Sequence, residues 1–214
     1  LSYVWPGVKW LGANVETRAA LAAPTIDLTL DVARPAPLAP LDKGGTSTNL
    51  ADLSFAPVLL GWHGKTLHQT AGIETFLPTG DYDEDEPVNT GRNYYQVAPF
   101  YAATWFPTEH WEASAKLRYG INSKNDKTDY RSGDELTLEF SAGYRFNGPL
   151  SAGINGYIYQ QTTDDRRDGT AVNGNGNRGS VDALGPYFMY RFSKDFAVVA
   201  KLQEEFGAKN KSEG

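Results

Sequence analysis

The sequence contains no cysteine, which excludes a disulfide scaffold, a thiolate metal site and a cysteine nucleophile. It also lacks any run of about 18 apolar residues, the length that a membrane-spanning helix requires. A chain of this kind can cross a membrane only as a closed β-barrel, whose strands satisfy one another's backbone hydrogen bonds. The formal net charge of −6 argues against a nucleic-acid partner.

Aromatic residues and glycine are plentiful instead. Aromatic side chains make up 13% of the chain and glycine contributes 22 residues, a composition that favours twisted strands and tight turns over packed helices. The mean hydropathy of −0.47 is compatible with a membrane barrel, because only alternate residues of each strand face lipid. No abrupt change of composition divides the sequence, so we expect a single transmembrane domain over residues 1–214.

Alternation of apolar and polar residues recurs along the chain. In the segment 110–122 every second residue from Trp111 to Ile121 is apolar, and the residues between them include Glu112, Lys116 and Arg118. The same pattern returns in the segments 67–77, 95–105, 135–146, 150–161 and 196–205. In one of these, Tyr95 and Trp105 stand at the two ends of a short apolar band. This placement is expected of aromatic girdles at membrane interfaces.

The connections between these segments alternate in length. Short turns are expected near residues 6–11, 64–65, 107–108, 147–148 and 193–194, and long hydrophilic connections over 33–51, 79–93, 123–133 and 162–180. An up-and-down transmembrane barrel has short periplasmic turns and long outer loops. A soluble β-sandwich also alternates along its strands, but it mixes its connection types irregularly.

The fold class predicted from these patterns is all-β, an antiparallel up-and-down transmembrane β-barrel with ten strands visible in the sequence. Both ends of the visible chain would then be extracellular, whereas barrels of this class have periplasmic termini. We therefore expect the chain to lack a strand at each end, and the intact barrel to have about 12 strands or more. The expected location is the bacterial outer membrane, in contact with its lipid and lipopolysaccharide.

If the apolar parity faces lipid, the charged residues point into the lumen, because charges are costly against hydrocarbon. The predicted pore-lining residues are Glu16, Arg18, Glu74, Glu112, Lys116, Arg118, Glu135, Glu139, Arg145, Arg191, Lys201 and Glu205. The predicted lumen aromatics are Phe100, Tyr157, Tyr159 and Tyr187, which offer a stacking surface to an aromatic solute or simply fill the lumen.

Two interpretations remain open for the cluster that Lys116 and Arg118 form with Glu135 and Glu139. In the first, the cluster lines a constriction and sets a transverse field that orients polar or anionic solutes. In the second, it is a ladder of salt bridges that fills and stiffens the wall.

Three prolines, Pro57, Pro99 and Pro186, lie on the lipid-facing parity, and each removes a ladder hydrogen bond. They indicate either ordinary bulges or a side opening towards the bilayer, through which hydrophobic solutes could leave. The acidic run 81–86 offers oxygen ligands but lacks the spaced pattern of a calcium loop. We interpret it as a solvated outer loop that divalent ions bridge to lipopolysaccharide, and we predict no resident metal or cofactor.

Several short motifs resemble a known family. They are LPTGDYD at 77–83, DYRSGDE at 129–135, YIYQQTTDD at 157–165, GNRG at 176–179, ALGP at 183–186 and EEFGAKN at 204–210. Over nearly the whole chain they resemble bacterial outer-membrane channels named after the meta-pathway of phenol degradation. The resemblance implies a monomeric barrel of about 12 strands that acts as a diffusion channel, with uptake of aromatic compounds suggested by the pathway name. The sequence departs from the family pattern at its ends, where strands are lacking.

The alternative functions are an outer-membrane barrel enzyme acting on lipids and a soluble β-sandwich binding module. A nucleophilic site needs a serine within hydrogen-bond reach of a histidine that an acid orients. The three histidines, His63, His68 and His110, all lie beside short turns. Neither Ser54 nor Ser114 combines a lipid-facing position with a histidine partner, so we predict no catalytic residue and no enzymatic activity.

Overall fold

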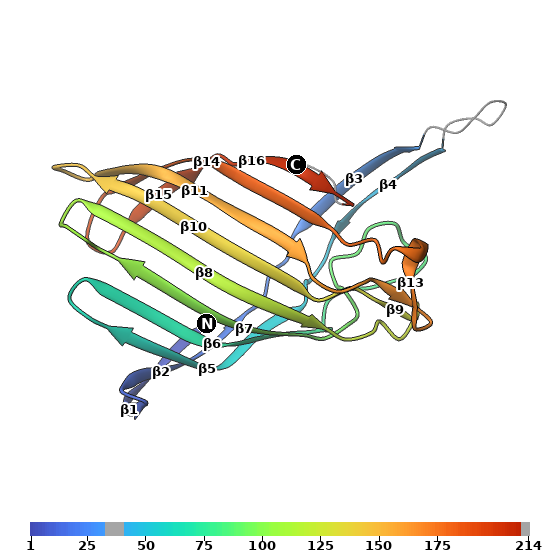
Figure 1. Ribbon diagram of the computed structural model, residues 1–214, viewed down its shortest axis with the longest axis horizontal. Coiled ribbons are helices and arrows are strands. Elements are labelled where there is room, and N and C mark those ends of the chain that lie inside the picture. Colours follow the sequence, from blue (N-terminus) through green and yellow to red (C-terminus); the bar gives the residue numbers. More distant parts are fainter. Residues whose placement is uncertain (33–40, 211–214) are drawn as a thin grey trace.

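The computed structural model describes residues 1–32 and 41–210, and antiparallel strands dominate it (Figure 1). One large sheet contains the ten strands expected from the sequence. In spatial order they are β1 (Ser2–Trp10), β2 (Ala13–Ala20), β5 (Leu53–His63), β6 (Leu67–Leu77), β7 (Gln96–Trp105), β8 (Trp111–Asn122), β10 (Glu135–Arg145), β11 (Leu150–Gln161), β14 (Ser180–Arg191) and β15 (Ala197–Lys201). β16 (Glu204–Lys209) continues the last strand after a break and also pairs with β14.

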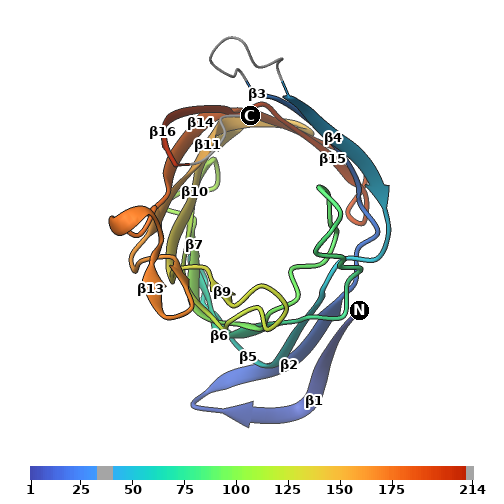
Figure 2. The same cartoon turned by 90° about the vertical axis from the view of Figure 1, so that its right-hand side faces the viewer.

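The sheet curls around a central space to form a barrel wall (Figure 2). Every strand is antiparallel to its neighbours, which confirms the predicted up-and-down topology. Within the described residues β1 is not hydrogen bonded to β15 or β16, so the wall is open between its first strand and its last. A count of about 12 strands in an intact barrel stays a prediction. Among residues 1–32 and 41–210, no helix is long and apolar enough to cross a membrane.

The connections sort to the two ends of the wall (Figure 1). At one end, which we call the short-turn end, tight turns link β5 to β6, β7 to β8, β10 to β11 and β14 to β15, as predicted. The opposite, long-loop end carries the connections 78–95, 123–134 and 162–179. Three two-residue strands, β9 (Tyr130–Arg131), β12 (Arg166–Arg167) and β13 (Thr170–Ala171), form a small sheet there, and a 3-10 turn, η1 (Val172–Gly174), follows β13.

The expected turn at residues 6–11 is wrong. β1 continues through Pro6 and Gly7, where the register with β2 shifts, so this dipeptide marks a bulge. Gly7 has a φ of 74°, which glycine adopts without strain, and Pro6 has no N–H that the bulge would leave unpaired. The chain reverses at Leu11 and Gly12, whose φ values of 51° and 77° are both positive, as a two-residue type I′ turn requires.

The expectation of a long connection without strands over 33–51 is wrong for residues 41–48, which form a strand. β3 (Thr25–Val32) and β4 (Leu41–Thr48) pair with each other as a separate hairpin, and residues 33–40 lie outside the described residues. β2 ends at Ala20, so the chain leaves the wall earlier than residue 33. Pro24 lies between β2 and β3 and has no N–H for a ladder, so the alternating segment after it finds a local partner instead of extending the wall.

The two faces of the sheet differ as the alternation predicts. Apolar side chains such as Ile73, Leu117 and Ile154 are about half exposed on one face. The other face is concave, because Tyr187 of β14 donates a hydrogen bond to Glu112 of β8 at 3.0 Å, across β11 and β10. Such a contact over intervening strands requires a face that curls inward. We call this concave side the lumen face.

Candidate functional site

A cluster of paired charges lies on the lumen face of β6, β8 and β10. The Lys116 Nζ lies 3.3 Å from a Glu74 oxygen, and Arg118 lies 3.3 Å from Glu135 and 3.9 Å from Glu74. Lys116 and Arg118 are two positions apart on β8, so both point to the same face. We call Glu74, Lys116, Arg118 and Glu135 the ionic cluster.

Amide side chains hold the ionic cluster in place. Gln96 donates a hydrogen bond to Glu135 at 2.9 Å and another to Asn122 at 2.7 Å, and its oxygen accepts one from Arg118. Gly120 leaves room for this amide, because a Cβ there would lie 2.9 Å from the Gln96 nitrogen. The prediction from sequence missed Gln96. The alternation could have found it, because Gln96 lies between the lipid-facing positions Tyr95 and Val97 and must therefore point into the lumen.

Aromatic rings lie against the cations of this wall. The centre of the Phe76 ring lies 4.9 Å from the guanidinium carbon of Arg92 and 5.2 Å from that of Arg118. Lys116 lies 4.7 Å from the centre of the Phe100 ring. The predicted lumen aromatic Phe100 is thus in contact with a cation, while Phe76 was missed although it shares the parity of Glu74.

A second polar group lies nearer the short-turn end. Arg145 approaches Glu112 at 3.5 Å, and the Tyr187 hydroxyl donates to the other oxygen of the same carboxylate. Tyr187 can lie across two strands because Gly143 and Gly153 have no side chains, and a Cβ at either glycine would overlap the tyrosine. Glycine at these inward positions therefore forms a groove for an aromatic ring.

The remaining predicted lumen residues fall into two groups. Glu16 pairs with Arg18 at 2.9 Å on β2, Tyr157 donates to Glu205, and Tyr159 donates to Glu135 at 3.1 Å. By contrast, Glu139, Arg191 and Lys201 form no ion pair with any described residue.

The predicted pairing of the cluster is therefore right in one part and wrong in another. Arg118 pairs with Glu135, as expected. Glu139 lies opposite Lys116 in the β8–β10 register, yet Lys116 pairs with Glu74. Glu74 can reach Lys116 over β7 because its partner on that strand is Ala98, whose side chain is small.

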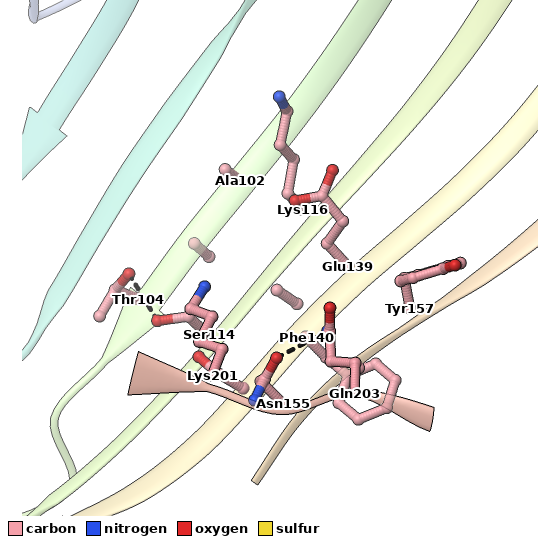
Figure 3. A pocket seen from close by; sticks show the side chains of 14 residues that line it. Ala102, Thr104, Ser114, Lys116, Glu139, Phe140, Asn155, Tyr157, Lys201 and Gln203 are labelled. Atoms are coloured by element: carbon pink, nitrogen blue, oxygen red, sulfur yellow. Dashed lines mark hydrogen bonds between the residues drawn. The ribbon is translucent and has the colours of Figure 1, made fainter. Parts of the chain in front are cut away.

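A cavity of about 410 Å³ lies beside this cluster on the lumen face (Figure 3). Its polar lining consists of Thr104, Ser114, Lys116, Glu139, Ser141, Asn155, Tyr157, Lys201 and Gln203, which come from β7, β8, β10, β11 and the last strand. The Thr104 and Ser114 hydroxyls are 2.9 Å apart, and Gln203 donates to Asn155 at 2.6 Å. Gln203 was not among the predicted site residues.

The prolines coincide with interruptions of the wall. At Pro57 the β5 strand bulges, since its register shifts against both β2 and β6. The Pro57 carbonyl accepts a hydrogen bond from the Thr17 hydroxyl at 2.8 Å. Pro99 lies opposite Ile73 of β6, in a gap of the β7–β8 pairing. Pro186 lies on β14 beside the break between β15 and β16.

A mostly apolar pocket of about 480 Å³ opens beside the Pro57 bulge. It is lined by Trp10, Pro57, Val58, Leu60, Ala71 and Ile73, together with Gly72 and Phe100, which have lumen-face parity. On the lumen face Leu59 covers Gly72, because a Cβ at Gly72 would overlap the Leu59 side chain. Leu59 is 1% exposed and closes the wall at this point.

The histidines contact one another or the backbone. The Nδ1 atoms of His63 and His68 are 3.2 Å apart, and His110 Nδ1 is 2.9 Å from the Arg145 carbonyl oxygen. Ser114 interacts with Thr104. Within residues 1–32 and 41–210, no hydrogen bond joins a serine hydroxyl to a histidine ring.

The connections of the long-loop end are joined through buried acidic side chains, and three of the motifs noted in the sequence, those at 129–135, 157–165 and 176–179, meet there. Asp165 accepts hydrogen bonds from the Tyr130 hydroxyl at 2.6 Å, the Gly133 N–H at 2.8 Å and the Gln161 amide at 2.7 Å. Burial and the adjacent Asp165 carboxylate raise the pKa of Tyr130 above its ordinary value. Arg178 pairs with Asp164 at 2.7 Å.

Two further links complete this chain of contacts. Asp52 accepts from the Gly80 and Arg92 N–H groups, both at 3.0 Å, and so joins the connection before β5 to that between β6 and β7. Asn93 donates to Asn125 at 2.9 Å and joins the latter connection to that between β8 and β10. Together with Asp165, these contacts are called the loop links.

The acidic run within the connection 78–95 folds on itself. Asp83 accepts a hydrogen bond from the Asp85 N–H at 3.0 Å, and its own N–H donates to Asn89 at 2.6 Å. No group of three histidine or acidic side chains that could hold a metal ion occurs in the described part of the chain. Bridging of this run to lipopolysaccharide by divalent ions stays a prediction.

Comparison with known proteins agrees with this architecture. The structure is similar to the crystal structure of the COG4313 outer membrane channel from Pseudomonas putida F1, with a TM-score of 0.68 and 16% sequence identity over 92% of this chain and 78% of that chain. This similarity shows the fold. No curated protein matches the sequence. A family model described as "MetA-pathway of phenol degradation" matches residues 1–214. The chain therefore belongs to the family of the MetA-pathway of phenol degradation.

Proposed function

We propose that the protein is an outer-membrane channel through which small solutes, aromatic compounds among them, diffuse passively. The observation that carries the proposal is the contrast between the two faces of the wall. Charged and hydrogen-bonding side chains occupy the lumen face, whereas apolar side chains cover the convex face. In this proposal the short-turn end faces the periplasm and the long-loop end faces the exterior. The family description and the similar channel support it.

Of the two interpretations of the ionic cluster, its geometry favours the ladder of salt bridges that stiffens the wall. It does not favour the transverse field across the lumen. Its two cations occupy β8, and its two carboxylates lie on either side of them, on β6 and β10. Paired charges on one side of the wall cancel over a short distance, so the cluster as a whole is close to neutral. We therefore expect a channel with weak ion selectivity.

Reconstitution of the purified protein into planar lipid bilayers tests the proposed function. We expect stepwise conductance, and liposomes carrying the protein should swell when transferred into solutions of small solutes. A preparation that neither conducts nor permits swelling would contradict the proposal. Release of fatty acids from the liposome lipids would support the alternative of a lipid-modifying enzyme.

A side branch towards the bilayer is the second part of the proposal, and the pocket beside the Pro57 bulge supports it. This pocket faces the lipid side, and Gly72 and Phe100 separate it from the lumen together with Leu59. An apolar solute would gain from such a route, because it could leave the lumen without crossing the aqueous periplasm.

Replacement of Leu59 by alanine is expected to open this side branch. The truncation removes the side chain that covers Gly72, and it should also lower the free energy of unfolding by about 2–5 kcal/mol. Since the chain contains no cysteine, a fluorophore can be attached to a single cysteine placed at Ala102 on the lumen face. Brominated acyl chains should quench this fluorophore more strongly in the Leu59→Ala variant. Equal quenching in Leu59→Ala and in the convex-face control Leu117→Ala would argue against a side branch.

A further inference from the structure

Two opposite charges of the lumen face have no partner in the described part of the chain, and both line the cavity of Figure 3. They are Glu139 on β10 and Lys201 on β15. The neighbouring charges of this wall are already paired with each other, as in the ionic cluster and the Glu112–Arg145 pair. Glu139 and Lys201 are therefore the charges of the cavity that a solute can neutralise.

Polar side chains of the last strand line the cavity at the break between β15 and β16. Gly185 makes the break possible, because any Cβ there would overlap the Leu202 carbonyl. The adjacent Pro186 accepts a hydrogen bond from the Leu202 N–H at 3.1 Å. The register with β14 is the same before and after the break, so Gln203 shares the parity of Lys201 on the lumen face, where it donates to Asn155.

The rest of the lining suits a flat, partly polar molecule. The Tyr157 ring borders the cavity (Figure 3). Its hydroxyl donates a hydrogen bond to Glu205, which holds the ring in position. The small side chains of Ala102 and Ser141 leave space. The Thr104 and Ser114 hydroxyls bond to each other, so one proton of this pair remains to donate to a solute. A volume of about 410 Å³ lies in the range of pockets that hold small ligands.

We propose that this cavity is a binding subsite for small aromatic carboxylates that carry a hydroxyl group. The carboxylate would be held by the Lys201 ammonium with help from the Ser114 hydroxyl, and the hydroxyl of the solute would donate to Glu139. The aromatic ring would lie against Tyr157. This inference rests on the proposed channel function and names the solute class for which the lumen is built.

Equilibrium dialysis with the full chain in detergent tests the subsite, with 4-hydroxybenzoate as the probe. Benzoate lacks the hydroxyl group and 4-hydroxybenzyl alcohol lacks the carboxylate, so each comparison removes one of the two contacts. We expect 4-hydroxybenzoate to bind about tenfold or more tightly than either analogue, because a hydrogen bond to a charged group contributes at least that factor.

Two variants assign the contacts. Lys201→Gln should weaken binding of 4-hydroxybenzoate by about tenfold and leave 4-hydroxybenzyl alcohol unaffected. Glu139→Ala should abolish the preference for 4-hydroxybenzoate over benzoate, because it removes the acceptor of the solute hydroxyl. The control is Lys194→Gln, which removes an exposed cation from the nearby turn outside the cavity. Equal binding by Lys201→Gln and the wild type, or no binding by the wild type, would overturn the subsite.

Failure of the subsite and failure of the channel are distinguishable. A wild-type protein that conducts in bilayers but does not bind the probe refutes the subsite alone. A protein that binds the probe with the expected variant effects but does not conduct refutes the channel and leaves the subsite standing.

Discussion

Replacement of Asp165 by alanine is expected to lower the free energy of unfolding by about 3 kcal/mol or more, because three donors lose their common acceptor. Asp165 is 7% exposed and accepts hydrogen bonds from Tyr130, Gly133 and Gln161. Water cannot readily replace the carboxylate at a buried position. Urea unfolding of the protein in liposomes, followed by tryptophan fluorescence, measures this loss.

The chemistry of the site predicts a graded series. Asp165→Asn should be milder than Asp165→Ala, because the asparagine oxygen can still accept from Gly133 and Gln161 and the Tyr130 hydroxyl can turn to accept from the amide. Asp168→Asn is the control, since it removes an exposed charge from the same connection. If Asp165→Ala were no less stable than this control, the connection would not depend on Asp165.

The Tyr130 hydroxyl adds a dependence on pH. The folded protein holds this proton more tightly than the unfolded chain, because burial and Asp165 raise the pKa of Tyr130. The contribution to stability is therefore complete below about pH 10 and is lost as the pH rises towards the raised folded-state pKa. Tyr130→Phe should remove this part of the alkaline loss, which urea unfolding at increasing pH would detect.

Glu74→Gln is expected to shift the channel towards anions by about fivefold in the permeability ratio of chloride to potassium. Glu74 faces both Lys116 and Arg118, and removing its charge leaves two cations with the single carboxylate of Glu135. One unit charge at about 4 Å contributes about 1 kcal/mol in water, which corresponds to this factor. The reversal potential under a KCl gradient reports the change.

A matched control and a compensating change sharpen this test. Glu84→Gln removes a carboxylate from the connection 78–95 at the long-loop end and should leave the reversal potential unaltered. The double variant Glu74→Gln with Lys116→Gln restores the charge balance and should return the permeability ratio towards that of the wild type. An unchanged ratio in Glu74→Gln would show that ions do not pass the ionic cluster.

Parity along each strand was the most reliable signal in the sequence. It placed Lys116 and Arg118 on one face because side chains alternate strictly along an extended chain. Parity does not determine register between strands that are far apart in the sequence. The choice of Glu74 over Glu139 as the partner of Lys116 depends on such a register and on the small Ala98 between them. It could not be predicted without the structure.

Local turn signals had a different limit. Pro6–Gly7 and Pro107–Thr108 look alike as turn candidates, yet only the second pair lies in a turn. A proline can end a strand or occupy a bulge, and the pairing of the next strand decides between the two. The role of Asp165 was hidden for a related reason, since its partners Tyr130 and Gly133 lie in a different connection, which meets that of Asp165 only in the folded protein.

The loop links have a consequence for the order of assembly. In the proposed orientation the long-loop end lies outside the cell, so its connections must cross the bilayer before Asp52, Asn125 and Asp165 can bind their partners. Contacts that form after the strands have inserted are absent from the transition state of insertion. Such contacts slow the loss of the folded barrel without slowing its formation. The buried acidic side chains Asp52 and Asp165 at the long-loop end thus stabilise the barrel kinetically only after its strands have inserted.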